Sequence, residues 1–306
     1  MSDNTKLSKT MTYLLRHAAI KEKVDMDDQG YVTIKDLLEW LFKNGFKTKE
    51  KDIKEIVAKD NKNRFTLKDK KIRANQGHSI KLKMIMKDFK QENSHVVHAT
   101  YLKNESGIRK NGLKSMSRNH VHMINIDSKT DKFHMIRQDT NLYVFVNDVK
   151  LKESENGVIL ADNVHPKYLT LVPAYDVKKS HCYGFIIFNQ DRDQVLVVVT
   201  KYGCYGFPKG KIEKGELPLA CAFRELNEET NLDPEDIEIL SGCISEVNNK
   251  GNVPTNYYYA IIRNNKKKLY CKDTDEDLQI KWMNINKLLR LSNKEFYPRR
   301  KKLLKF

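Results

Sequence analysis

The chain has 306 residues, carries a formal net charge of +16 and is 40% hydrophobic. This length allows two domains or three compact lobes, and the basic balance favours polyanionic partners, with nucleic acid ahead of an anionic membrane. The absence of a long apolar run and of a signal peptide predicts an intracellular protein, cytoplasmic or nuclear, with no membrane contact. The five cysteines lack paired spacing, which argues against zinc and disulfides; a monomer is favoured.

Residues 1–88 read as helices followed by a small hairpin. Apolar residues recur at helical spacing at Leu7, Met11, Leu14 and Leu15. In chain order, the patterns predict a helix over 7–18, a strand and helix over 31–45, a helix over 49–60, and strands at 65–67 and 71–74. This order predicts a winged-helix lobe, an architecture common in nucleic-acid binding, although fold alone says little about function.

Cationic side chains single out three stretches of the N-terminal half. They are Arg16 with His17, Arg64, and Arg118. Arginine presents a rigid fork of donors that grips phosphate oxygens through paired hydrogen bonds. Three arginines and one histidine together would hold a phosphate dianion, whereas each arginine taken singly is typical of an ordinary surface.

The surrounding sequence resembles the RNA 2'-phosphotransferase family, the enzymes that finish tRNA splicing by removing an internal 2'-phosphate. The resemblance covers about residues 6–172. It rests on segments that follow one another in the family's order: LSKTMTYLLRHAA, DDQGYVTIKDLL, KNRF, IRANQGHSIK, VVHATYL, GLKSMSRNHVHM, NLYVFVNDV and SENGVIL. In that family an Arg-His-Arg-Arg tetrad clamps the RNA 2'-phosphate, and the matching positions are Arg16, His17, Arg64 and Arg118.

Residues 89–177 read as a lobe of short strands, expected over 95–100, 120–124, 142–147 and 158–160. By the same resemblance, this lobe has an ADP-ribosyltransferase-like fold that binds NAD. The family's His-x-Thr motif is matched by His98 and Thr100, and the second histidine falls on His120 or His122, with His122 favoured. Val158 stands where other ADP-ribosyltransferases carry a catalytic glutamate.

The hydrophobic residue at that position has a chemical consequence, because the nucleophile must then be anionic already, as an RNA phosphate is. The resemblance implies that the RNA 2'-phosphate attacks C1″ of the nicotinamide ribose and that nicotinamide leaves. The ribose O2″ then attacks phosphorus, releasing RNA with a free 2'-OH and ADP-ribose 1″,2″-cyclic phosphate. Arg64 and Arg118 would stabilise the transition state, and His17 would shuttle protons or orient the phosphate.

Residues 206–232, GFPKGKIEKGELPLACAFRELNEETNL, carry the most specific chemistry in the chain. Apolar spacing predicts a helix that begins near Pro218. On it Glu225, Glu228 and Glu229 share one face and are expected to converge on one point, where like charges repel unless a cation lies among them. Oxygen ligands of this kind suit Mg2+ or Mn2+. The preceding loop adds glycines for tight turns and lysines for phosphates.

This stretch resembles the Nudix box, G-x5-E-x7-R-E-U-x-E-E-x-G-U, where U is aliphatic. The matching residues are Gly210, Glu216, Arg224, Glu225, Leu226, Glu228, Glu229 and Leu232. Asn231 replaces the last glycine of the pattern, and asparagine is the next most tolerant residue at a left-handed helix end. The resemblance implies an α/β/α sandwich over residues 178–306, so that the whole chain is an α+β and α/β multidomain protein.

The Nudix resemblance also implies roles for the acidic residues. Glu228 and Glu229 would ligate the metal, Glu225 would ligate metal or activate water, and Arg224 with Glu216 would brace the loop and helix. The ions would polarise a diphosphate and lower the pKa of the attacking water. A further glutamate outside the box, matched by Glu276 with Asp275 and Asp277 as rivals, would complete the metal site or act as general base.

The sequence leaves three alternatives for the diphosphate that the Nudix domain would cut. The lysine-rich loop looks most like the mRNA-decapping branch of the Nudix family, which acts on capped RNA 5' ends. Dinucleoside polyphosphate hydrolases share its Pro-Lys-Gly, and the ADP-ribose product of the first domain also contains a pyrophosphate. The residues 297–306, YPRRKKLLKF, are expected to form a basic tail that tracks RNA backbone or is simply solvated.

Three functions remain for the chain as a whole. The first is a bifunctional RNA enzyme that joins an NAD-dependent 2'-phosphotransferase to a Nudix hydrolase. The second makes the first domain an ADP-ribosyltransferase for RNA ends, with a Nudix domain that reverses the mark. The third, a basic RNA-binding platform, is disfavoured because a binding module has no use for clustered acids.

Overall fold

The computed structural model describes residues 3–60, 62–83, 86–129, 132–173, 181–248, 250–263, 266–272 and 277–304. The chain forms two compact units. The first comprises Met1–Lys90, Lys110–Ile124 and Asp148–Lys167, and the second comprises Gln91–Arg109, Asn125–Asn147 and Tyr168–Phe306. The chain is thus an α+β protein in which each unit draws on several stretches of sequence. The division at residues 88 and 177 stays a prediction.

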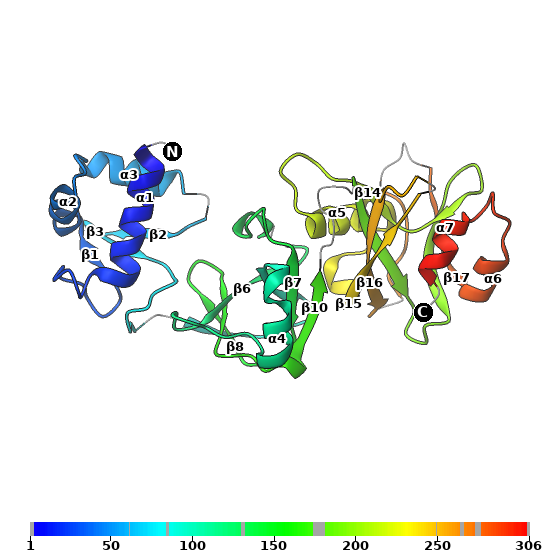
Figure 1. The fold of residues 1–306 in the computed structure, drawn as a ribbon, viewed down its shortest axis with the longest axis horizontal. Coiled ribbons are helices and arrows are strands. Elements are labelled where there is room, and N and C mark those ends of the chain that lie inside the picture. Colours follow the sequence, from blue (N-terminus) through cyan, green and yellow to red (C-terminus); the bar gives the residue numbers. More distant parts are fainter. Residues whose placement is uncertain are drawn as a thin grey trace. The chain divides into compact units, whose positions relative to one another are not determined.

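The first unit begins with helices around a small antiparallel sheet (Figure 1). Its elements are α1 (Asp3–Tyr13), η1 (Leu14–Ala18), β1 (Val32–Thr33), α2 (Ile34–Lys43), α3 (Glu50–Ala58), β2 (Phe65–Lys68) and β3 (Lys71–Ala74). The strand order is β1-β3-β2. The expected helices and hairpin are therefore confirmed.

Local chemistry explains where these elements begin and turn. Thr33 caps α2, because its Oγ1 accepts a hydrogen bond from the backbone N–H of Asp36 over 3.0 Å. Asp69 and Lys70 have φ values of 48° and 58°, the left-handed conformation that a two-residue hairpin turn requires. The apolar stripe predicted from the sequence is buried, with Met11 and Leu14 fully covered in the core of this lobe.

Four further strands complete the first unit: β4 (Met86–Phe89), β6 (Val121–Ile126), β8 (Leu151–Ser154) and β9 (Ile159–Ala161). They pair antiparallel, β6 with β9, β9 with β8 and β8 with β4. Strands β6 and β9 lie close to the predicted positions. Strand β4 escapes the pattern because its exposed residues show no apolar alternation.

The second unit contains the other strands of the expected ADP-ribosyltransferase-like lobe. Its elements up to residue 173 are β5 (His95–Thr100), η2 (Leu102–Asn104), most of α4 (Glu105–Asn111), η3 (Phe133–Met135), β7 (Leu142–Val146) and β10 (Leu169–Pro173), while η4 (Pro166–Tyr168) begins in the first unit and ends in the second. Strand β7 pairs antiparallel with both β5 and β10. Helix α4 could not be recognised in the sequence because Ile108 is its one buried residue.

The rest of the second unit is a mixed sheet with helices. The strands are β11 (Cys182–Phe188), β12 (Gln194–Val199), β13 (Tyr205–Gly206), β14 (Lys209–Lys211), β15 (Ile237–Glu246), β16 (Thr255–Ile262) and β17 (Gln279–Asn284). The sheet order is β13-β12-β11-β16-β15, with β14 also on β11 and β17 also on β12. Strands β11 and β16 run parallel.

Helices cover both faces of this sheet (Figure 1). The helical elements are α5 (Pro218–Thr230), η5 (Pro234–Asp236), α6 (Ile285–Arg290), α7 (Pro298–Lys301) and η6 (Lys302–Leu304). Alternate residues of β11 face opposite layers, so that Phe185 packs on Phe223 of α5 while Ile186 packs in a core with Leu288 and Leu303. The expected α/β/α order is confirmed.

An aromatic cluster joins α5 to the strands of residues 91–147 within this unit. Phe223 of α5 lies 5.1 Å from Phe185, 5.8 Å from His95 on β5 and 6.4 Å from Phe133, measured between ring centroids. His95 in turn meets Phe145 of β7 edge to face at 5.6 Å. The apolar face of α5 is therefore covered by two sets of strands that are far apart in sequence.

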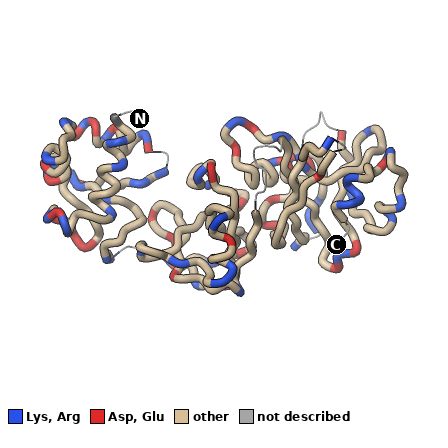
Figure 2. Tube along the Cα trace, in the orientation of Figure 1, with Lys and Arg blue, Asp and Glu red and all other residues tan. Residues whose placement is uncertain are grey.

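Residues 297–304 of the basic C-terminal segment are folded, so the expected solvated tail is wrong for these residues, while RNA contact by the segment stays a prediction. Leu303 and Leu304 are buried in the core under the sheet. Arg300 Nη1 donates to the carbonyl of Tyr205 over 2.7 Å, and Arg299 pairs with Glu246, which is 2% exposed. Burial of the two leucines places the segment against the core, where the contacts of Arg299 and Arg300 stabilise the fold. Other basic residues are spread along both units (Figure 2). Within the described ranges, every helix is too short or too polar to cross a bilayer.

The aromatic cluster gives a test of stability. Replacing the 5%-exposed Phe223 by alanine removes a large buried ring, and such changes cost about 3–5 kcal/mol. We therefore expect Phe223→Ala to lower the midpoint of thermal unfolding of the second unit. Tyr202→Ala, at a position of the same unit that is 82% exposed, is the matched control and should unfold as the wild type does. Equal midpoints for the two variants would contradict the packing described.

Candidate functional site

Arg16 and His17 lie on η1, a π-helical turn that continues α1. The backbone N–H of Ala19 donates to the carbonyl of Leu14 over 3.0 Å, which is the i to i+5 bond of a π-turn. Such turns are rare in proteins overall, and those that occur are often found at functional sites. The turn leaves Arg16 half-buried and His17 exposed, so two neighbouring cationic groups emerge from the end of one helix.

A backbone loop after β3 holds these two residues. Ser79 donates its N–H to the carbonyl of Arg16 over 3.0 Å, and its Oγ lies 3.1 Å from His17 Nδ1. Gly77 has a φ of +80°, and a Cβ there would lie 3.2 Å from Arg16 Nη1. Glycine is thus needed for both the turn and the close approach of the guanidinium. The sequence marked this segment as part of a family motif, but not its role as a seat for Arg16.

Arg64 is held directly before β2 by a buried acid. Asp60 accepts hydrogen bonds from both the backbone N–H and Nη1 of Arg64, and its side chain is 4% exposed. A carboxylate buried in this way is stable because both of its oxygens are bonded to a cationic residue. Sequence reasoning missed Asp60. Its signal is an acidic residue four positions before a functional arginine.

Arg118 lies on the exposed loop before β6, close to a residue predicted to bind NAD. Its Nη1 is 3.2 Å from Nδ1 of His122. Because arginine only donates, Nδ1 of His122 is the acceptor and the proton of the neutral ring is on Nε2. The structure therefore brings together one predicted phosphate-binding residue and one predicted NAD-binding residue.

Electrostatics show that the four tetrad positions lie in one region of the first unit. Burial, followed by the charges of Arg118 and Arg64, lowers the pKa of Arg16 to about 10. Burial, followed by Arg16 and Arg118, also lowers the pKa of His17. The one acid that acts on Arg16 is Asp60, the smallest of the contributions named for it. Gathered cations with so little compensation favour an anionic ligand.

A polar latch fastens the turn before β9 to the loop that carries Arg64. Asn156 Nδ2 donates to the carbonyl of Asn63 over 3.2 Å, and Gln76 Nε2 donates to Ser154 Oγ over 2.9 Å and to Asn156. The buried Arg73 pairs with Glu155 in the same turn. Since this turn leads directly to residue 158, the latch ties the phosphate-binding loop to the predicted NAD-binding side of the unit.

The remaining predicted NAD residues are placed by strands in both units. His98 and Thr100 lie on β5 in the second unit, where Thr100 Oγ1 accepts from Asn104 over 3.0 Å. His122 and Val158 belong to the first unit, in which β6 pairs with β9 and puts His122 opposite Leu160. The competing His120 lies just before β6 and is half-buried.

Arg224 organises the acidic cluster of the second unit. Its Nε and Nη2 bond the two carboxylate oxygens of Glu216 at 2.9 and 3.1 Å, and Nη2 also donates to the carbonyl of Lys211 over 2.9 Å. Burial alone would raise the pKa of Glu216, but hydrogen bonds from Arg224 and from the N–H of Glu213 lower it. Arginine and glutamate thus brace the loop against the helix.

The three helix carboxylates are not directed at one point, which differs from the geometry expected. Arg224 Nη1 lies 2.7 Å from Glu225 Oε1 and 2.9 Å from Glu228 Oε2, so the guanidinium stands between these two. Glu229 is 6% exposed, and its Oε2 accepts from the N–H of Lys209 over 2.8 Å. Arg224 and the loop backbone therefore neutralise charge that the sequence pattern assigned to a cation alone.

Glu225 has the most constrained place in this cluster. A Cβ at Gly210 would lie 1.9 Å from its Cδ, so only glycine admits the carboxylate here. Burial raises the pKa of Glu225, against the lowering influence of Arg224, and Glu228 raises it further. A carboxylate with a raised pKa beside another acid is typical of a site that takes up a cation or a proton.

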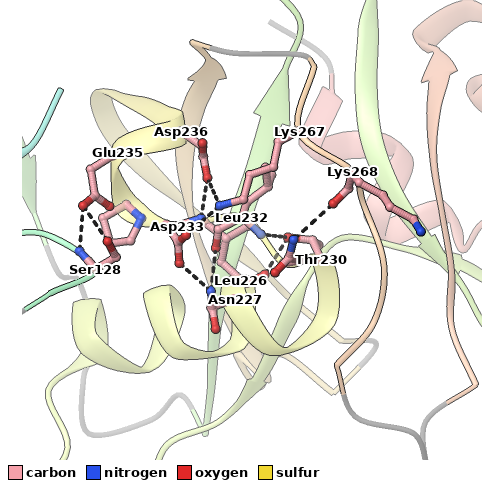
Figure 3. Close-up of polar contacts among 12 residues, drawn as sticks. Ser128, Leu226, Asn227, Thr230, Leu232, Asp233, Glu235, Asp236, Lys267 and Lys268 are labelled. Atoms are coloured by element: carbon pink, nitrogen blue, oxygen red, sulfur yellow. Dashed lines mark hydrogen bonds and ion pairs between the residues drawn. The ribbon is translucent and has the colours of Figure 1, made fainter.

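The end of α5 is fixed by its own network (Figure 3). Asn231 has φ 63° and ψ 12°, which confirms the left-handed helix end expected from asparagine. Asp233 and Asp236 lie in the turn that follows the helix, and Lys267 Nζ lies 2.6 Å from a carboxylate oxygen of the first and 2.5 Å from one of the second. Glu235 accepts from Ser128 through both its N–H and its hydroxyl at 2.8 Å. These contacts hold the helix that presents the acidic residues.

The carboxylates of Glu225, Glu228 and Glu229 fit a hard divalent ion in their chemistry but only partly in their arrangement. Carboxylate oxygens are the ligands such an ion prefers, yet among the residues that the structure describes no three acids, histidines or cysteines are grouped for metal binding. Glu276 and its rival Asp275 lie outside the described residues. Glu225, Glu228 and Glu229 are therefore the described residues on which a metal site would be built.

With this geometry established, comparison with known proteins decides the family. Residues 2–163 match the family described as RNA 2'-phosphotransferase, Tpt1 / KptA family, which is more than half of the 306 residues. The chain belongs to this family. Residues 181–305 match the NUDIX domain. The protein therefore has an RNA 2'-phosphotransferase domain and a C-terminal Nudix hydrolase domain.

Individual relatives agree with the first assignment. The chain is 35% identical over 174 residues to a probable RNA 2'-phosphotransferase of Rhizobium leguminosarum bv. trifolii, covering 54% of this chain and 93% of that protein. It is 33% identical to tRNA 2'-phosphotransferase 1 of Danio rerio, covering 52% and 78%. The solved C. elegans Ap4A hydrolase binary complex matches 40% of this chain and 92% of its own, at 21% identity and a TM-score of 0.35. The resemblance to the decapping branch stays a prediction.

The phosphotransferase domain also contains a buried histidine that makes its stability depend on pH. Burial, followed by Arg16, His17 and Arg73, lowers the pKa of His78 to about 4, and this side chain is 4% exposed. Because the unfolded chain takes up the proton near pH 6.5, stability is lost as the pH falls toward 4. When the pH is lowered from 7.5 to 5, we expect protonation of this histidine in the unfolded chain to reduce the free energy of unfolding by about 2 kcal/mol.

A pair of variants measures this contribution by chemical unfolding at the two pH values. His78→Gln should lose less stability than the wild type on acidification. His165→Gln removes an exposed histidine from the same unit and is the control, which should follow the wild type. An identical loss in His78→Gln and the wild type would show that His78 takes up its proton in the folded protein.

Proposed function

We propose that the protein is a bifunctional RNA enzyme. Its first activity transfers an internal RNA 2'-phosphate to NAD, giving ADP-ribose 1″,2″-cyclic phosphate and nicotinamide. Its second activity is metal-dependent hydrolysis of a nucleoside diphosphate linkage. The family match supports the RNA substrate and the use of NAD, and the Nudix match supports the hydrolase.

One observation carries the proposal for the transferase: Arg118 Nη1 lies 3.2 Å from His122 Nδ1. A reaction between RNA phosphate and NAD requires that their binding groups be neighbours. Arg118 belongs to the predicted phosphate tetrad and His122 to the predicted NAD motif, so this pair supplies that neighbourhood. Both residues also lie in the unit that contains Arg16, His17 and Arg64.

The tetrad would act on charge and protons in two displacement steps. The RNA 2'-phosphate first forms a bond to C1″ of the NAD ribose as the bond to nicotinamide breaks. The ribose O2″ then bonds to phosphorus, its proton is removed, and the RNA 2'-oxygen departs and is protonated. Arg16, Arg64 and Arg118 would balance the phosphate charge in both steps. The lowered pKa of His17 leaves the imidazole neutral near pH 7 and able to accept a proton.

The Nudix activity would use the residues around Arg224. Glu225, Glu228 and Glu229 would hold Mg2+ or Mn2+, which when bound would polarise the diphosphate and acidify the attacking water. Arg224 and Glu216 would keep the loop of residues 209–214 next to the helix, a role supported by their hydrogen bonds to each other and by the bond from Arg224 to the carbonyl of Lys211. The raised pKa of Glu225 makes it the carboxylate best able to take a proton from water.

For the natural diphosphate, we favour the ADP-ribose product of the first activity. Its pyrophosphate has the linkage that the hydrolase is proposed to cut, and the transferase releases it within the same protein. RNA 5' caps and dinucleoside polyphosphates are the other candidates, to be compared directly as substrates.

Two variants separate the activities. Arg118→Ala should lower 2'-phosphate transfer about 100-fold or more because it removes a charge that stabilises the reacting phosphate, while diphosphate hydrolysis remains. Glu229→Gln should abolish hydrolysis at saturating Mg2+ or Mn2+ and spare the transfer. Wild-type transfer by Arg118→Ala, or wild-type hydrolysis by Glu229→Gln, would refute the corresponding role.

The readout is the set of small-molecule products formed from 2'-phosphorylated RNA, NAD and Mg2+. Intact ADP-ribose 1″,2″-cyclic phosphate would refute the favoured diphosphate, whereas its conversion to AMP would support it. Matched controls are Arg109→Ala and Glu238→Gln, since both side chains are exposed and lie outside the two clusters. Both should behave as the wild type.

A further inference from the structure

A polar groove runs along α1 and α3 in the first unit and ends at Arg64. It has a volume of about 460 Å³, and its lining is Asn4, Thr5, Ser8, Lys9, Thr12, Ile56, Lys59, Asp60 and Arg64. The α1 residues recur at steps of three and four, so they form one stripe of the helix, beside the stripe that buries Met11 and Leu14. The groove therefore lies along the flank of α1 and is closed on its other side by residues of α3 and of the chain that follows it.

The chemistry of the lining excludes an apolar occupant. Ile56 is its one hydrophobic residue and is 7% exposed, so the accessible wall consists of hydroxyl, amide and charged groups. Thr12 donates its hydroxyl hydrogen to the carbonyl of Ser8 over 2.7 Å, which leaves its oxygen as an acceptor. Such a wall suits a ligand with hydroxyl and phosphate groups.

The charge balance of the lining favours an anion. Lys9, Lys59 and Arg64 contribute three positive charges against the single carboxylate of Asp60. Asp60 is 4% exposed and bonded to Arg64, so little of its charge faces the groove. Lys59 pairs with Glu55 on α3, but its side chain is 70% exposed, and an exposed pair of this kind contributes little and is easily exchanged for a phosphate.

Continuity with the catalytic cluster identifies which anion would occupy the groove. Arg64 is both the end of the groove and a member of the group that acts on Arg16. If that group holds the 2'-phosphate, the strand must continue from the same ribose through its phosphodiester links. None of the described residues of the lining is aromatic, so these residues offer no surface for base stacking.

We propose that this groove binds the ribose-phosphate backbone of the RNA nucleotide next to the 2'-phosphate. The inference rests on the proposed function of the tetrad and adds a second contact region to it. Lys9 and Lys59 bind the flanking phosphate, while the hydroxyls of Ser8 and Thr12 bind ribose or phosphate oxygens. Recognition in the groove is independent of base identity, because the backbone is the part of the strand that it contacts.

The test measures binding of fluorescent 2'-phosphorylated ligands to the full chain in the absence of NAD. One ligand is a nucleoside 2'-phosphate, which has no flanking phosphodiester, and the other is a hexanucleotide with the 2'-phosphate at an internal position. The double variant Lys9→Glu, Lys59→Glu should weaken hexanucleotide binding by about 10-fold or more and lower its salt dependence, because phosphate contacts are lost. Thr12→Val keeps the shape of the side chain and should weaken hexanucleotide binding by a smaller factor.

The matched control is Lys51→Glu, Lys54→Glu, which makes the same charge change on exposed positions of α3 outside the groove. Equal weakening by the two double variants would overturn the proposal, since it would reflect general charge. Equal weakening of nucleoside 2'-phosphate and hexanucleotide binding would also overturn it, by placing the effect at the tetrad. Transfer assays are run separately, so loss of catalysis in the wild type would refute the proposed function and leave this binding comparison valid.

Discussion

Like charges held close together are the constraint on which both candidate sites depend. In the first unit, burial and then the charges of Arg118 and Arg64 lower the pKa of Arg16, and the buried Asp60 is the acid that anchors Arg64. In the second unit the signs are reversed, with Arg224 set between Glu225 and Glu228. Each cluster therefore keeps one opposite charge that fixes its geometry without cancelling it. The uncompensated charge is positive in the first unit, where a phosphate would neutralise it, and negative in the second, where a metal ion would.

Rigid surroundings hold the charged side chains of both clusters in place although their charges repel. The guanidinium of Arg16 is seated against Gly77, and the carboxylate of Glu225 against Gly210. A side chain at Gly210 would occupy the space of the carboxylate, and one at Gly77 would crowd the guanidinium and strain the left-handed backbone, so the backbone itself shapes both sites. The latch from Asn156 to Asn63 and the network after α5 act in the same sense, because they hold the loops on which the charged residues stand.

How far the sequence predicts this structure depends on whether the signal is local. The spacing of Leu7, Met11 and Leu14 predicts a helix and its buried side, and Asn231 predicts a left-handed helix end, because neighbours in sequence determine both. Asp60 and the latch depend on tertiary approach, which periodicity does not contain. The basic C-terminal segment misleads for the same reason: two leucines that pack under a distant sheet outweigh its charge. The role of Glu276 stays a prediction.

The packing of Phe223 has a consequence for how the protein can be divided experimentally. Its ring meets His95 and Phe133, which belong to the matched phosphotransferase region, as well as Phe185 of the Nudix sheet. A fragment that contained only the Nudix region would leave this aromatic surface in water, where it would promote aggregation. A soluble fragment with the hydrolase therefore needs residues 91–147 as well, because they cover the apolar face of α5.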